Sequence, residues 1–374
     1  MLERFKVPIK EQVRVSEKSL RRTVTAFFGK MGESSEDAAI ASDTLVTSDL
    51  RGVESHGVSN MLSHYRNGYE NKKIKPRPNW RIVRETPGTA NIDADNGLVV
   101  FLGRHAMQIA IDKAKKVGVG SVTVFNSEHS GAIGHHAMGA AQQDMIGMVM
   151  TSASARVVPT FASKALLGTN PIAVAAPARN EAPFLYDAAT CSVAMNKIWI
   201  ARRLGSMLGP GWICDNQGVP IEESILTPES DDEFLLLPLG GTREQGSHKG
   251  SGLAMIVDIM GPLLAGSLPD MLSNVDNVDR KQSHHFTAYN IEAFTELDTF
   301  KNNMDRMLQM IRETKPVSGE ERVLYPGLIE YEEEQERRAN GIPFHKEVMT
   351  WFEGLAEELS IPGLDTCEEN IKSS

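Results

Sequence analysis

Between residues 119 and 293 the sequence alternates short apolar runs with amphipathic stretches, and this pattern constrains the fold more than any other feature. Short runs rich in alanine, valine and isoleucine are typical of strands that are buried on both faces. Strands that alternate with helices indicate an α/β sheet. The expected strands are residues 121–125, 146–152, 172–176, 184–187 and 285–291, and the expected helices are residues 132–144 and 250–264.

Both ends of the chain are expected to be mainly helical. Ser16 can cap a helix whose apolar residues recur at helical spacing until Gly32, a typical residue just past a helix end. A second helix is expected from about residue 34 to 51, and a third is expected at residues 297–312, where apolar residues recur at helical spacing. The acidic C-terminal part is also expected to be helical. No low-complexity linker is present. The simplest organisation is a helical domain of residues 1–118 plus 294–374, with an α/β domain of residues 119–293 inserted into it.

The composition excludes several classes of protein. The formal net charge is -10, from 49 acidic and 39 basic residues, and the short basic run at 71–77 is no nucleic-acid-binding stripe. No apolar run approaches the ~18 residues that a membrane span needs. Neither the three cysteines nor the adjacent histidine pairs at 135–136 and 284–285 have metal-ligand spacing, so no metal is expected. The N-terminus lacks a signal peptide, which predicts a cytoplasmic location.

The common catalytic and nucleotide-binding motifs are missing. A dinucleotide fingerprint needs three glycines in the pattern G-x-G-x-x-G between a strand and a helix. Residues 118–120 and 250–252 supply only the first two glycines of that pattern. A P-loop, a nucleophile elbow and a zinc-binding H-E-x-x-H are also absent. Generic motifs therefore predict no more than an enzyme-like α/β protein.

Five polar segments rich in small residues remain as candidate sites. Residues 54–57 follow a predicted helix and residues 126–131 follow a predicted strand, and each segment contains a histidine that can exchange a proton near neutral pH. Residues 168–171 precede one strand and residues 187–190 end the next, at positions where α/β sheets bind ligands. Residues 247–252 open a helix and contain Lys249, a combination that suits a phosphate. Each segment also has a purely structural interpretation, as a helix cap or a turn.

In this order, the segments resemble the malate/L-lactate dehydrogenase family of the sulfolactate dehydrogenase type. The matching motifs are DLRGVESHGV at 49–58, NSEHSGA at 126–132, LGTNPIA at 167–173, DAAT at 187–190 and KGSGLA at 249–254. Weaker matches lie at 325–327, 337–338 and 341–343. The resemblance spans nearly the whole chain. Relatives include ureidoglycolate dehydrogenase, diketogulonate reductase and piperideine-2-carboxylate reductase.

The resemblance implies a three-layer α/β fold with a mixed sheet, in which a cofactor domain that is not of the Rossmann type is inserted into a helical domain. This would account for the missing dinucleotide fingerprint. The implied cofactor is NAD or NADP, and the implied partners are a small 2-hydroxy or 2-oxo acid and a second copy of the chain. Hydride transfer at the substrate carbon needs a proton donor or acceptor at the neighbouring oxygen.

The resemblance also assigns roles to residues. His129 and His56 are the expected catalytic residues; we favour His129 as the proton donor, with His56 orienting the substrate. The expected substrate-binding residues are Ser55, Asn60, Arg51 and Asn170. The expected cofactor-binding residues are Ser152, Asp187, Ala188, Ala189, Thr190, His248, Lys249, Pro326 and Gly327.

Two positions depart from the family pattern. Asn60 stands where many relatives carry an arginine expected to bind the substrate carboxylate, and Leu328 stands where they often carry glutamate. Asparagine is neutral and shorter, so another cation is needed, and Arg51, Arg156 and Lys164 are candidates. The same departure leaves open an imine reductase that forms cyclic or N-alkyl amino acids. A non-catalytic cofactor-binding protein is the third alternative.

Overall fold

The computed structural model describes residues 6–276 and 281–367. The chain divides into two compact units, one of residues Met1–Arg77 and Ile329–Ser374 and the other of residues Pro78–Leu328. The α/β unit therefore extends beyond the expected range of 119–293, because a strand and a long helix before residue 119 pair with and pack on the sheet. Among the described residues, no helix has both the length and the apolar character needed to cross a membrane.

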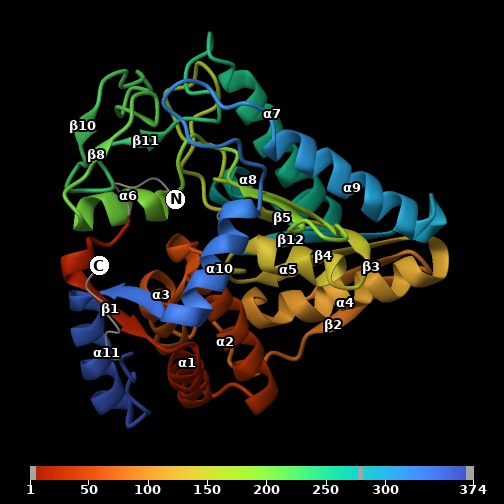
Figure 1. Cartoon of the computed structure of the whole chain (residues 1–374), viewed down its shortest axis with the longest axis horizontal. Helices are drawn as coiled ribbons and strands as arrows, with labels where there is room; N and C mark the ends of the chain where they lie inside the picture. The colour runs from red at the N-terminus through yellow and green to blue at the C-terminus, as the bar shows by residue number, and fades with distance from the viewer. Residues whose placement is uncertain (1–5, 277–280, 368–374) are drawn as a thin grey trace. The chain divides into compact units, whose positions relative to one another are not determined.

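The α/β unit is built on a mixed sheet of seven strands (Figure 1). In spatial order these are β2 (Arg81–Glu85), β3 (Thr89–Asp93), β4 (Val119–Ser127), β12 (Gln282–Asn290), β5 (Met145–Ser152), β6 (Ile172–Ala176) and β7 (Phe184–Ala188). Only β3 and β4 are parallel, and all the other neighbouring strands are antiparallel. The predicted α/β fold with a mixed sheet is confirmed.

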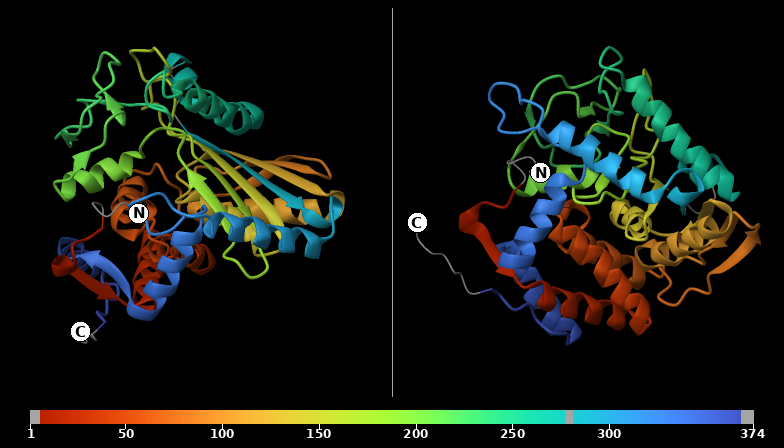
Figure 2. Two further views of the ribbon diagram at one scale, coloured as in Figure 1. Left: turned by 45° about the horizontal axis from the view of Figure 1, so that its top comes forward. Right: turned by 45° about the vertical axis from the view of Figure 1, so that its right-hand side comes forward.

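Helices cover both faces of this sheet and make three layers. Helices α4 (Val99–Val117) and α5 (Ile133–Ala141) pack together on one face, where the His136 ring meets Phe286 of β12. Helix α7 (Ser247–Asp258) continues into the π-helical segment η4 (Ile259–Leu263) on the other face, where Ser267 Oγ lies 2.8 Å from Ser283 Oγ. Figure 2 shows α7 and α4 on opposite sides of the twisted strands. Successive residues of β12 thus face opposite helical layers.

Shorter elements complete the α/β unit. Its remaining elements are α6 (Met195–Arg203), β8 (Met207–Leu208), β9 (Ile213–Cys214), β10 (Ile225–Leu226), β11 (Leu235–Leu236), α8 (Asp270–Asp276), η5 (Ile291–Ala293) and α9 (Leu297–Arg312). Strands β8 and β10 pair with each other, as do β9 and β11.

The other unit is mainly helical. It contains η2 (Ile9–Glu11), β1 (Gln12–Val15), α1 (Glu17–Met31), α2 (Ser35–Leu50), η3 (Glu54–His56), α3 (Val58–Glu70), α10 (Leu328–Asn340), β13 (Ile342–His345) and α11 (Lys346–Leu359). The predicted caps are present: Ser16 and Ser34 accept backbone N–H groups at the starts of α1 and α2, and Gly32 ends α1 with φ 101°. Strand β1 pairs with β13 and so joins the two ends of the chain.

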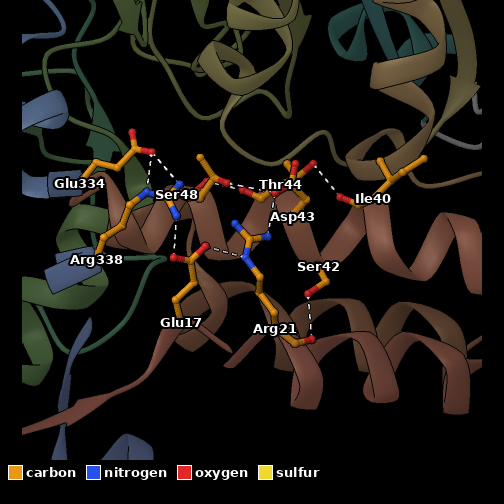
Figure 3. A network of polar contacts seen from close by, with 10 residues as sticks. Glu17, Arg21, Ile40, Ser42, Asp43, Thr44, Ser48, Glu334 and Arg338 are labelled. Carbon is orange, nitrogen blue, oxygen red and sulfur yellow. Dashed lines mark hydrogen bonds and ion pairs between the residues drawn. The ribbon is translucent and has the colours of Figure 1, made fainter. Parts of the chain in front are cut away.

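Ion pairs between α1, α2 and α10 tie the helical unit together (Figure 3). Arg21 bonds Glu17 at 2.8 Å and Asp43 at 2.7 Å. Arg338 bonds the same Glu17 at 2.5 Å and Glu334 at 2.8 Å. Each arginine therefore bridges two carboxylates, and the shared Glu17 links all three helices. Such a network is worth more than isolated surface pairs.

Glu33 is a buried acid that predicts a pH-dependent stability. Tyr69 donates a hydrogen bond to its carboxyl group, and burial raises the pKa of Glu33 to about 8. The folded chain thus holds this proton more tightly than the unfolded chain, so the stabilisation is present below pH ~4.5 and is lost as pH rises through about 8. Glu33→Gln keeps the acceptor and removes the titration. As pH rises from 5 to 9, we expect the free energy of unfolding of the variant, relative to that of the parent, to increase by roughly 2–5 kcal/mol in urea unfolding. Parallel pH profiles of the two proteins would contradict this.

Candidate functional site

The ends of several strands bring the predicted polar segments of the α/β unit to one edge of the sheet. Ser127 at the end of β4 lies opposite Gln282, and Ser152 at the end of β5 lies opposite Ser283, the next residue of β12. Ala188, the last residue of β7, lies opposite the first residue of β6. The segments 126–132, 152–156, 168–171 and 187–190 therefore follow or precede strands at the same edge, which we call the loop edge.

His129 lies half-buried at the loop edge, and its ring is held at Nδ1. The backbone N–H of Gly131 donates to His129 Nδ1 at 3.1 Å, and the N–H of Val100 donates to the His129 carbonyl oxygen at 3.2 Å. Because Nδ1 accepts a hydrogen bond, the neutral ring carries its proton on Nε2. A second proton on Nδ1 would replace the bond to Gly131 with a repulsive contact. The ring is thus arranged to donate a hydrogen bond from Nε2.

A buried polar network fixes the residue that follows His129. The Ser130 carbonyl oxygen accepts a hydrogen bond from His136 Nε2 at 2.9 Å, and Ser130 Oγ lies 3.3 Å from Thr151 Oγ1. Thr151 Oγ1 in turn lies 2.9 Å from His284 Nδ1. Burial lowers the pKa of both imidazoles to about 3, so both rings are neutral at physiological pH. The network joins α5, β5 and β12 behind the His129 loop.

Ser152 and Asn170 connect the loop edge to helix α7. Ser152 Oγ donates to Asp258 Oδ1 at 2.8 Å. Asn170 is fully buried with φ 37°; its Oδ1 accepts the Ala153 N–H at 2.9 Å, and its Nδ2 donates to the Ala254 carbonyl oxygen at 2.9 Å. The Asn170 amide thus links the end of β5 to α7. Its substrate-binding role stays a prediction.

The start of α7 packs on Leu239, and a backbone hydrogen bond ties Leu239 to the loop edge. Thr190 donates its N–H to the Thr169 carbonyl oxygen at 2.9 Å and accepts the Leu239 N–H at 2.9 Å. Gly250 packs so closely on Leu239 that a Cβ at Gly250 would lie 2.3 Å from the Leu239 backbone nitrogen. Gly246 caps α7 without a side-chain hydrogen bond, and Lys249 is exposed in the first turn. The N–H groups of Ser247 and Lys249 already donate to the carbonyl oxygens of Thr242 and Gly246, so a phosphate here would be bound mainly by exposed side chains such as Lys249.

In the helical unit, His56 lies in the 3-10 turn η3. Its Nδ1 lies 3.0 Å from Ser55 Oγ. A hydroxyl group both donates and accepts hydrogen bonds, so this contact is compatible with either neutral tautomer and with the doubly protonated ring. His56 can therefore gain and lose a proton at Nε2 while it keeps its partner at Nδ1. This freedom distinguishes it from His129.

Two other predicted substrate-binding residues lie near this turn. Asn60 Nδ2 donates to the Glu54 carbonyl oxygen at 2.6 Å, which closes the turn onto the first residues of α3. Arg51 Nη1 pairs with Glu334 Oε2 of α10 at 2.9 Å. The Arg51 guanidinium already has a carboxylate partner, so of the three candidate cations it is the least available to a substrate.

Similarity to known proteins identifies the family of this chain. The family described as malate/L-lactate dehydrogenase matches residues 15–353. This chain belongs to that family. It is 38% identical over 357 residues to a malate dehydrogenase of Pyrococcus abyssi, covering 94% of this chain and 97% of that protein. It is 34% identical to an L-sulfolactate dehydrogenase of Methanocaldococcus jannaschii, covering 89% and 93%. The malate dehydrogenase structure from Entamoeba histolytica has a TM-score of 0.88 at 31% identity, covering 94% and 99%.

The resemblance seen in the sequence is thus confirmed, and the remaining predicted residues can be placed in this malate/L-lactate dehydrogenase fold. Asp187 Oδ2 accepts the Gly134 N–H at 2.7 Å, which ties β7 to the first turn of α5. Ala188 ends β7 and Ala189 follows it at the loop edge. Pro326 and Gly327 lie beside β7, where the Pro326 carbonyl oxygen accepts the Leu185 N–H at 3.1 Å. Their cofactor-binding roles stay predictions.

In each unit of this dehydrogenase family member, residues to which the sequence assigned no role also surround the candidate segments. Asp49 and Arg337 surround the His56 turn, and His136, His284 and Asp258 lie behind the loop edge. Each is polar and almost fully buried. Asp49 and Arg337 lie inside matched segments of the sequence, whereas His284 lies far from every one of them. In the described part of the chain, no three metal-ligating side chains gather in a metal-binding cluster.

Proposed function

We propose that this chain is a nicotinamide-dependent dehydrogenase that interconverts a small 2-hydroxy acid and the corresponding 2-oxo acid. The observation that carries the proposal is the loop edge, where four polar segments of a chain of this family meet at the ends of neighbouring strands. Small-molecule sites in α/β sheets lie at such strand ends. In the oxidative direction, the hydroxyl proton leaves for a side chain and the carbon-bound hydrogen leaves as hydride.

We propose that His56 transfers the proton and His129 orients the substrate, the reverse of the division that the sequence favoured. Support comes from the two hydrogen bonds at Nδ1. His56 keeps its Ser55 partner in every protonation state, as a general acid and base must. His129 accepts the Gly131 N–H, so its Nε2–H donates a hydrogen bond to the substrate oxygen without leaving the ring. Neutral histidines with this electrophilic role occur in other enzymes.

The residues around α7 fit the charged part of a nicotinamide cofactor. Helix α7 begins without a capping side chain, and Lys249 and His248 lie exposed in its first turn, with Arg243 Nη1 3.0 Å from His248 Nδ1. These donors suit a pyrophosphate group. A bound nicotinamide supplies or accepts the hydride. Whether the cofactor is NAD or NADP is left to experiment.

We infer that Arg156 is the best candidate to bind the substrate carboxylate. It lies at the loop edge after β5, it is exposed, and it forms no ion pair with any described residue. Arg51, in contrast, is paired with Glu334, and Asn60 donates to the Glu54 carbonyl oxygen. Lys164, also exposed, is the second candidate.

A turnover screen tests the proposed function. The purified chain is assayed with NAD and NADP against 2-hydroxy acids, with NADH and NADPH against 2-oxo acids, and with 2-oxo acids plus amines. We expect turnover of a small 2-hydroxy acid with at least one cofactor. Asn60 in place of the family arginine motivates the imine reductase alternative, which requires a rate gain from added amine. Failure to bind either cofactor in a fluorescence titration would favour the non-catalytic alternative. The cytoplasmic location stays a prediction.

We also propose that the chain forms a homodimer through the exposed face of α7 and η4. Five large apolar side chains there are 44–57% exposed: Met255, Ile256, Ile259, Leu263 and Leu264. An apolar stripe of this kind on a helix commonly marks an interface. Ile259→Asp with Leu263→Asp is expected to give a monomer in sedimentation velocity at micromolar concentration. Met310→Asp on α9, 76% exposed, is the matched control and should leave the assembly unchanged. A monomeric parent protein would refute the proposal.

A further inference from the structure

A fully buried acid, Asp49, lies directly behind the turn that carries His56. Asp49 Oδ2 accepts the Val58 N–H at 2.7 Å, and its Oδ1 has no hydrogen-bond partner among the described residues. Gly57 makes room for the carboxyl group, because a Cβ there would lie 1.9 Å from Asp49 Oδ1. Gly57 has an extended backbone, with φ -85° and ψ -176°. Its lack of a side chain is thus required by the Asp49 carboxyl group and not by its backbone conformation.

Asp49 supplies a cap that the local sequence of α3 does not. Helix α3 begins after Gly57, which has no side chain to accept the first N–H groups. A helix start without such an acceptor is less stable, because its first N–H groups have no partner. Asp49 belongs to the last turn of α2 and reaches across residues 51–57 to the first residue of α3. The Asp49 carboxyl group therefore ties the far end of the segment that carries Ser55 and His56 back to the end of α2.

Arg337 of α10 fixes the same segment from outside. It is buried, and its Nη1 donates to the Asp49 carbonyl oxygen at 2.6 Å. Its Nη2 bonds Glu54 Oε1 at 2.7 Å, and its Nε bonds Glu333 at 3.0 Å. The Glu54 carbonyl oxygen also accepts the Asn60 amide. Glu54, just before Ser55, and Val58, the second residue after His56, are thus held by side chains from three helices.

We propose that Asp49 is a positioning residue for His56, because its carboxyl group accepts the Val58 N–H behind the turn and so fixes the turn in place. This inference rests on the proposed function, in which His56 transfers the proton. Burial raises the pKa of Asp49 to about 8, and the nearby Glu54 carboxylate acts in the same direction while Arg337 opposes it. The Val58 N–H needs an acceptor and no negative charge. Asparagine, which has the same shape and one carbonyl oxygen, should therefore replace Asp49, whereas alanine should not.

The test compares Asp49→Asn with Asp49→Ala in the full chain. We expect Asp49→Asn to keep kcat within about threefold of the parent, and Asp49→Ala to lower kcat by about tenfold to a hundredfold with the KM for cofactor nearly unchanged. The His56 imidazole signals, followed by NMR as a function of pH, should match the parent in the asparagine variant and shift or broaden in the alanine variant. Glu33→Ala removes another buried acid of the same unit and should leave both kcat and the His56 signals unchanged.

A double-mutant cycle keeps the proposal testable if Asp49→Ala folds poorly. Gly57→Ala pushes its methyl group into the Asp49 carboxyl group, so we expect it to disturb the His56 signals in the parent and much less in the Asp49→Ala background. Additive effects would overturn the proposal, as would an asparagine variant as impaired as the alanine variant. Loss of stability in Asp49→Ala with unchanged kcat and His56 signals would show a merely structural role. A parent without turnover would refute the proposed function, while the NMR comparison would still decide the role of Asp49.

Discussion

His56→Ala is expected to lower kcat by about 10²–10⁴-fold in both reaction directions. The variant has no group that can take the hydroxyl proton at the point where His56 Nε2 would receive it, and Ser55 cannot replace it because a serine hydroxyl is far too weak an acid or base near pH 7. Cofactor affinity should change little, since His56 lies in the helical unit and the predicted phosphate-binding residues lie at the start of α7. Steady-state kinetics and a nicotinamide fluorescence titration measure the two quantities.

The control for this variant is His64→Ala. His64 is an exposed histidine of α3, eight residues further along the same unit, and its removal should leave kcat unchanged. The pH profile adds a second criterion. One limb of the kcat/KM profile of the parent should disappear in His56→Ala. If His56→Ala keeps near-parental turnover with the same pH profile, His56 is not the proton-transferring group.

Local sequence signals predicted many elements of the α/β unit with accuracy. The expected strand 172–176 and the motif-free helix 297–312 coincide with β6 and α9. An apolar run between a proline and a turn, and a clear helical spacing of apolar residues, define these elements without reference to the rest of the chain. The strands β2 and β3 were not foreseen. Strand β2 is an exposed edge strand, and β3 buries only Ala90 and Ile92, so neither contains the continuous apolar run that marks a buried strand.

Long-range pairing could not be predicted in the same way. The sequence places β4 and β5 in succession, separated by one helix, yet β12 lies between them in the sheet. Residues 282–290 thus pair with strands more than 130 residues earlier in the chain, and the local apolar pattern contains no information about such partners. The alternation of strands and helices predicted the class of fold, and the order of the strands needed the structure.

For the candidate site, too, the sequence predicted local features but not those that depend on contacts in the folded chain. Histidines in glycine-rich segments next to strand or helix ends are visible in the sequence, and so is the lysine that opens α7. The proton positions on these histidines are not visible in the sequence, because they depend on the partner at Nδ1. That partner is a backbone N–H for His129 and a serine hydroxyl group for His56. Asp49 was also invisible, since a single acid inside a helix is ordinarily solvated, whereas here it is buried against Gly57.

His129→Ala and His129→Asn are expected to differ from each other, and this difference tests the division of roles between the two histidines. We propose that His129 donates one hydrogen bond from Nε2 to the substrate oxygen. Removal of a single donor of this kind lowers kcat by about 10²–10³-fold, which is the expectation for alanine. Asparagine keeps an N–H donor on a shorter side chain and should recover part of that loss. Neither change should remove the limb of the pH profile that we assign to His56.

The opposite outcome has a clear signature. If His129 transferred the proton, asparagine would be as impaired as alanine, because an amide neither gains nor loses a proton near pH 7. The limb of the pH profile would then disappear in both variants. Nitrogen NMR of the His129 ring gives an independent criterion: the bond from Gly131 predicts a neutral ring with its proton on Nε2 and a bare Nδ1. A ring that is doubly protonated at the pH of maximal turnover would require His129 to break that bond, and the roles of the two histidines would have to be exchanged.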